Sequence, residues 1–186
     1  MNVTPFRHPQ WEYPGIDNWQ TWHSYWYPYY TYGQYDHRQT DRYPSAYSPI
    51  ELKDFGGKPF VVNIERAAKQ NQNYRTVIWT GKHLQVVLMS IEAGGDIGLE
   101  VHPDVDQFIR IEQGRGLVMM GDRRDRLDFQ REVSDDDAIM IPAGTWHNVI
   151  NTGRTPIKLY TLYAPPEHPF GTVQRTKAEA MAAAQK

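Results

Sequence analysis

The chain has 186 residues, no cysteine and a formal net charge of −2. The lack of cysteine excludes disulfides, thiolate catalysis and cysteine-ligated zinc, so any bound metal must be held by histidine, carboxylate, amide or water oxygen. The near-neutral charge without a basic stripe argues against a nucleic-acid partner, and no apolar run approaches the roughly 18 residues that a membrane span needs.

Residues 1–58 are predicted to form an N-terminal arm without a core of its own. Residues 1–47 contain four of the six tryptophans and nine of the twelve tyrosines, are interrupted by prolines and have almost no valine or leucine. This stretch follows neither a helical nor a strand period. Two interpretations stay open: a flexible low-complexity tail, or an arm whose rings cover another surface. Residues 1–15 lack the basic and apolar segments of a secretory signal, which favours a cytoplasmic location.

From residue 59 onward the sequence predicts short β-strands separated by turns. The predicted strands are residues 59–64, 74–80, 83–91, 107–112, 116–120, 127–133, 138–141, 147–150 and 157–163. One or two helical turns are expected at residues 65–70. Many short strands without intervening helices predict an all-β sandwich or barrel over residues 59–168. Residues 169–186 are expected to form a tail with a short helix, because Thr176 and Glu179 match a capping box.

Four side chains with oxygen or nitrogen donors are predicted to converge on one point of this β region. Residues two apart on a strand face the same way, so Glu100 and His102 point together. Gln107 opens the next strand, and a Pro-x-Gly turn before another strand delivers His147. Three neighbouring strands can thus build a metal pocket from these four residues. From the residue types alone, Glu100 is either a ligand or a hydrogen-bond partner that orients a histidine, and Gln107 is either a ligand or a pocket hydrogen-bonder.

The two segments that carry these donors, residues 94–114 and 136–151, resemble the paired motifs of the cupin superfamily. The positions shared with those motifs are Gly94, His102, Gly114, Pro142, Gly144, His147 and Asn151. Three positions depart from the family pattern. Glu100 stands in place of the first histidine, Gln107 in place of the glutamate, and Asp136 in place of the leading glycine of the second motif.

The resemblance implies a single cupin barrel, that is, a double-stranded β-helix or jelly roll. It also implies that His102 and His147 bind a metal and, by position, that Glu100 and Gln107 complete the ligand set. Small cupin barrels commonly pair, so the resemblance further implies a homodimer. The tryptophan and tyrosine rings of the arm would suit such a contact.

Residues 100–104 are similar to the Gln-x-His-Pro-Asp stretch of type I mannose-6-phosphate isomerases, in which the Gln and His bind zinc. This likeness implies a small, single-barrel, mannose-6-phosphate isomerase-like cupin.

The expected function is a metal-dependent enzyme that acts on a small oxygen-rich molecule such as a sugar or a hydroxy-keto acid. The cofactor is a divalent ion, for which zinc, manganese, iron, nickel and cobalt all remain open. Glu100 is the candidate catalytic base, provided that the ion does not hold it tightly. One alternative is a dioxygenase-type cupin. Another is a non-catalytic module that binds a sugar or metabolite, or a coat or assembly protein that uses the aromatic arm.

Overall fold

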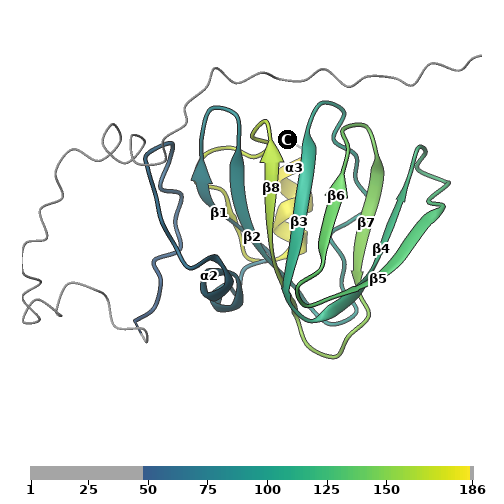
Figure 1. Cartoon of the computed structure of the whole chain (residues 1–186), viewed down its shortest axis with the longest axis horizontal. Coiled ribbons are helices and arrows are strands. Elements are labelled where there is room, and N and C mark those ends of the chain that lie inside the picture. Colours follow the sequence, from purple (N-terminus) through teal and green to yellow (C-terminus); the bar gives the residue numbers. More distant parts are fainter. Residues whose placement is uncertain (1–47, 185–186) are drawn as a thin grey trace, which may run out of the picture. The chain divides into compact units, whose positions relative to one another are not determined.

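The computed structural model describes residues 48–184 (Figure 1). Most of the predicted aromatic arm, residues 1–47, lies outside the described residues. In chain order the described elements are α2 (Ile64–Gln70), β1 (Arg75–Thr80), β2 (Gln85–Ile91), β3 (Asp106–Gln113), β4 (Arg115–Gly121), β5 (Phe129–Ser134), β6 (Ala138–Ile141), β7 (Trp146–Asn151), β8 (Ile157–Ala164), β9 (Val173–Gln174) and α3 (Lys177–Ala184).

The strands form two antiparallel sheets. The larger sheet has the order β6-β3-β8-β2-β1-β9 and the smaller has the order β5-β4-β7. Figure 1 shows β1, β2, β8, β3 and β6 in a row, with β7, β4 and β5 at one end of that row. The predicted all-β class with a short C-terminal helix is therefore confirmed.

Alternate residues from both sheets form one buried cluster. On β8, Ile157, Leu159 and Tyr163 are at most 1% exposed, and Val118 of β4 and Val149 of β7 belong to the same cluster. This alternation follows from the two-residue period of a strand, which sends every second side chain to the same face. Each fully buried aliphatic side chain of this kind stabilises the fold by roughly 1.5–3 kcal/mol.

A second, smaller core lies on the other face of the large sheet, where α2 packs. Ala67 and Ala68 of the helix are fully buried and cluster with Ile78 of β1 and Leu88 of β2. The two small side chains let the helix approach the sheet closely. Because α2 covers this face, the strands beneath it are buried on both sides.

The strand predicted at residues 59–64 is wrong. Asn63 instead caps the start of α2, because its side-chain oxygen accepts a hydrogen bond from the backbone N–H of Arg66 at 2.9 Å. Asparagine at such a cap satisfies a backbone donor that has no partner inside the helix. Val61, which the strand pattern would place in a sheet, is 97% exposed. The helix predicted at residues 65–70 is confirmed.

The C-terminal segment adds an edge strand that the sequence pattern does not reveal. Gln174 of β9 lies opposite Arg75 of β1, and two residues are too few to show a strand period. The predicted cap of α3 is present, since the hydroxyl of Thr176 accepts from the backbone N–H of Glu179 at 3.2 Å. Neither α2 nor α3, the helices of the described part of the chain, has the length and apolar character needed to cross a lipid bilayer.

Candidate metal centre

Glu100 and His147 lie opposite each other in a hydrogen-bonded backbone pair. The N–H of Glu100 donates to the carbonyl of His147 at 3.0 Å, and the N–H of His147 donates to the carbonyl of Glu100 at 2.9 Å. Residues paired in this way in an antiparallel ladder place their side chains on the same face. On β7 that face is the buried one, and His147 is fully buried.

The turn before β7 links His147 to His102. The carbonyl of Pro142 accepts from the N–H of Thr145 at 3.1 Å, and Gly144 has a φ of +77°. Glycine adopts this left-handed conformation without the cost that a side chain brings. The N–H of Gly144 also donates to the carbonyl of His102 at 2.8 Å. The Pro-x-Gly motif therefore fixes the two histidine segments side by side.

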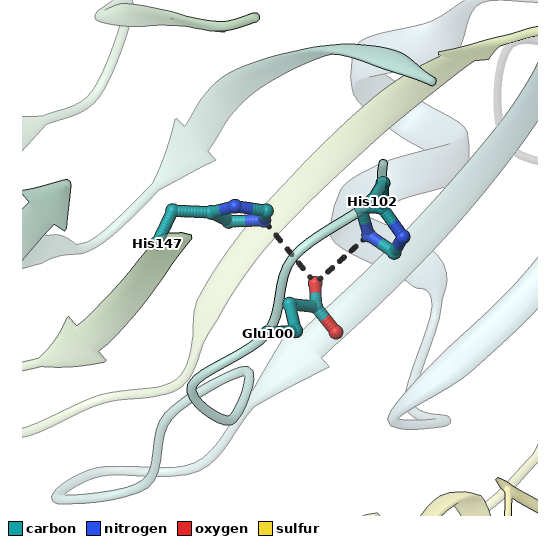
Figure 2. Close-up of side chains that lie close together, drawn as sticks. All are labelled: Glu100, His102 and His147. Atoms are coloured by element: carbon teal, nitrogen blue, oxygen red, sulfur yellow. Dashed lines mark ion pairs between the residues drawn. The ribbon is translucent and has the colours of Figure 1, made fainter. Parts of the chain in front are cut away.

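The side chains of Glu100, His102 and His147 converge on one small volume. The Oε1 atom of Glu100 lies 3.5 Å from Nε2 of His102 and 3.4 Å from Nε2 of His147. Figure 2 shows the two imidazoles approaching this oxygen from different sides, while the second carboxylate oxygen points away from them. One donor atom from each of the three residues lies within 4.8 Å of the others. The predicted convergence of these three side chains is confirmed.

Both imidazoles are oriented by a hydrogen bond at Nδ1. For His147 the partner is the carbonyl of Thr145, at 2.8 Å, which can only accept. For His102 the partner is a carboxylate oxygen of Glu167, at 3.1 Å. A neutral imidazole that donates from Nδ1 presents its lone pair at Nε2. Both Nε2 atoms are buried and have no hydrogen-bond partner among the described residues.

This donor set fits a divalent metal ion. Two ligand atoms held at about 2.1 Å from one ion, at a tetrahedral angle, lie about 3.4 Å apart, which is close to the two observed distances. Buried polar atoms without partners are uncommon in folded proteins, and a shared ion would satisfy both Nε2 atoms. Imidazole with carboxylate suits borderline ions such as zinc, iron, nickel, cobalt and manganese. Three protein ligands would leave open positions for water or substrate.

The electrostatics of the cluster keep its carboxylate ionised. Burial alone would raise the pKa of Glu100, but the two adjacent imidazoles outweigh burial and lower the pKa to about 2. Burial would likewise lower the pKa of His102, yet the carboxylates of Glu100 and Glu167 outweigh it and raise the pKa. The cluster is thus built to attract positive charge at Nε2 of His102, whether a proton or a metal ion.

Gln107, the fourth predicted ligand, is buried on β3 beside this cluster. Its amide nitrogen donates to the hydroxyls of Thr161 and Tyr163, each at 3.1 Å, and its amide oxygen has no partner among the described residues. The ring of Tyr163 lies against His102 with centroids 5.5 Å apart. Ligation by Gln107 stays a prediction, and the hydrogen bonds to β8 agree with the alternative of a pocket hydrogen-bonder.

A pocket of about 730 Å³ opens beside the cluster. Glu100 and His102 line it together with residues of α3 and of the loop after β8. His168 of that loop stacks edge-on against Tyr163, with ring centroids 5.0 Å apart. Burial and then the positive charge of Arg75 lower the pKa of His168 to about 3, so this ring is neutral near pH 7.

Two residues of this region carry no signal in the sequence pattern. Glu167 follows two prolines in an irregular loop, and nothing in its spacing links it to His102. Arg75 is the second residue of the strand predicted at residues 74–80 and resembles an ordinary solvent-facing charge, although it is 8% exposed. Both acquire their positions only when β8 and β9 fold against the rest of the sheet.

Comparison with known protein families identifies a cupin domain at residues 87–163. This segment contains Glu100, His102 and His147. It includes β3 to β7 in full and most of β2 and β8.

Three similar proteins match a larger share of the chain. The uncharacterized protein YrkC of Bacillus subtilis is 70% identical over 132 residues, which are 71% of this chain and 71% of YrkC. The uncharacterized protein L612 of Acanthamoeba polyphaga mimivirus is 44% identical over 115 residues, which are 61% of this chain and 70% of L612. The crystal structure of BH2720 from Bacillus halodurans has 65% identity and a TM-score of 0.70, over 70% of this chain and 99% of that one.

Proposed function

This chain belongs to the cupin family, and we propose that it is a metal-dependent enzyme acting on a small oxygen-rich molecule. One observation carries the proposal. Two buried imidazole Nε2 atoms without hydrogen-bond partners face the same carboxylate oxygen of Glu100, and a hydrogen bond at Nδ1 orients each ring toward it. We assign His102, His147 and Oε1 of Glu100 as ligands of one divalent ion.

The residues around the proposed ion have different roles. When bound, the ion supplies Lewis acidity toward a substrate oxygen. Glu167 and the carbonyl of Thr145 keep the two imidazoles in the tautomer that ligation requires. The second oxygen of Glu100 points away from both rings (Figure 2) and is the candidate proton acceptor.

The finer assignment is an isomerase-like reaction on a sugar or a hydroxy-keto acid. It is supported by the likeness of residues 100–104 to the zinc-binding stretch of type I mannose-6-phosphate isomerases. The pocket beside Glu100 and His102 has a volume suited to a small metabolite. The homodimer and the cytoplasmic location belong to the same proposal and rest on the sequence arguments given above.

Metal analysis of purified full-length protein tests this proposal. The unmodified chain is expected to hold about one equivalent of divalent ion after loading and desalting, and His102→Ala and His147→Ala are each expected to lose it. His83→Ala is the matched control, because His83 lies exposed in the turn before β2. A screen of sugars and hydroxy-keto acids on the loaded protein then tests the reaction. Full metal content in either cluster variant would contradict the assignment.

A further inference from the structure

Arg75 is a buried cation without a carboxylate partner. It is 8% exposed, and no Asp or Glu of residues 48–184 lies within ion-pair distance of it. Its Nη1 donates to the side-chain oxygen of Gln174 at 2.7 Å, and the ring of Tyr74 lies 5.4 Å from the guanidinium carbon. Its Nε is buried and has no hydrogen-bond partner among these residues. Buried charges are normally paired, and Arg75 departs from this rule within residues 48–184.

The fold fixes the orientation of this guanidinium. Arg75 points to the same side of β1 as Val77, a member of the main core. Gln174 lies directly opposite on β9, where its amide holds one end of the guanidinium. The two-residue edge strand therefore works as a positioning element for Arg75. The edge formed by Nε and Nη2 makes no hydrogen bond to any residue in the described range.

The same pocket joins Arg75 to the metal cluster. Arg75, Glu100 and His102 all line the cavity of about 730 Å³. Two of the other charged residues there, Asp96 and Lys177, neutralise each other through an ion pair of 2.7 Å. The two remaining carboxylates of the pocket, Glu100 and Glu167, already face the imidazoles, so the positive charge of Arg75 is left for a ligand.

We propose that this pocket binds a small organic acid, with one carboxylate on Arg75 and a second oxygen group at the ion held by Glu100, His102 and His147. This inference rests on the proposed function and narrows its substrate class from oxygen-rich molecules in general to acids. Nη2 makes no hydrogen bond to the described residues and, unlike Nε, is not enclosed, so it can donate to a carboxylate oxygen. A charge-assisted hydrogen bond between a guanidinium and a carboxylate is one of the stronger kinds. A single guanidinium also balances the single charge of a carboxylate.

Two probe acids that differ only in the distal carboxylate test the proposal. Malate carries this group, and 2-hydroxybutanoate has a methyl group in its place. The hydroxyl and its adjacent carboxylate, which both acids share, are assigned to the ion, so the distal carboxylate of malate is the group that binds Arg75. Titration calorimetry on the Zn²⁺-loaded full chain is expected to show malate binding about tenfold to a hundredfold more tightly, the range for a charge-assisted hydrogen-bonded pair. This comparison needs no variant. Arg75→Gln is expected to remove the preference while leaving Zn²⁺ content and 2-hydroxybutanoate affinity unchanged, and Arg75→Lys to restore part of it.

Arg124→Gln is the matched control, because Arg124 lines the same pocket but is exposed and lies over the Trp146 ring. It is expected to keep most of the malate preference. Equal binding of the two acids to the unmodified chain, or a preference that survives Arg75→Gln, would overturn the acid proposal while the metal site stands. Inorganic phosphate competing as well as malate in an Arg75-dependent way would also overturn it, in favour of a phosphate site. Failure of Zn²⁺ to bind would remove both proposals together.

Discussion

Glu167 offers a test of how the metal centre is organised, because it touches the centre only through His102. Its carboxylate lies 3.1 Å from Nδ1 of His102 and is 31% exposed. Removing such a partner of a ligating histidine typically lowers metal affinity by about 10- to 100-fold, or about 1.4–2.7 kcal/mol of binding free energy. We expect Glu167→Gln to lie near the lower limit, because the amide oxygen still accepts the hydrogen bond. Glu167→Ala removes both acceptor and charge and should approach the upper limit.

Competition with a chromophoric zinc chelator measures these affinities, and elemental analysis at saturation confirms that stoichiometry is unchanged. Glu132→Gln is the control, since Glu132 is exposed on β5. If both Glu167 variants bind zinc as tightly as the control, the reasoning is refuted, because the orientation of His102 then does not depend on this contact. A fall in the unfolding temperature of the metal-free variants would instead assign Glu167 to the stability of the loop.

Three further predictions concern the rest of the chain. Gln107→Glu should tighten divalent metal binding, because it adds a negative charge beside a net-positive centre; an unchanged affinity would place Gln107 outside the ligand set. Leu88→Ala, which empties part of the core under α2, should lower the free energy of unfolding by about 2–5 kcal/mol without changing metal content, measured by urea denaturation and elemental analysis. The pKa of Asp96 is lowered because the hydrogen bonds from Lys177 and Gly98 outweigh burial. The ionised Asp96 therefore stabilises the fold by less than about 1 kcal/mol above about pH 4. This stabilisation is lost as the pH falls through the folded-state pKa of Asp96. The difference in unfolding free energy between Asp96→Asn and the unmodified chain should therefore vanish in acid.

The strands were predictable because their side chains alternate with a clear period. Ile109 and Ile111 share the buried face with Gln107, as the sequence pattern requires. The segment at residues 59–64 shows where this reasoning fails. Its apolar residues have the composition of a strand, but the cap formed by Asn63 starts a helix there.

The part of the candidate metal centre that depends on local backbone geometry was predictable from the sequence. Glu100 and His102 are two residues apart, and His147 follows a turn with a recognisable motif. Glu167 and Arg75 were not predictable, since their roles depend on contacts between segments distant in the sequence: β8 carries the loop of Glu167 to His102, and β9 brings Gln174 to Arg75. Such pairings form only in the folded sheet and produce no periodic pattern in the sequence.

The central claim is that one divalent ion is bound by His102, His147 and Glu100. Anomalous diffraction from a crystal of the zinc-loaded protein, recorded on both sides of the zinc absorption edge, tests it most directly. We expect a single strong peak about 2.0–2.2 Å from Nε2 of both histidines and from Oε1 of Glu100, with Nδ1 of His102 still hydrogen-bonded to Glu167. A peak at Nδ1 of either histidine, a peak at another site, or no peak at full zinc loading would contradict it.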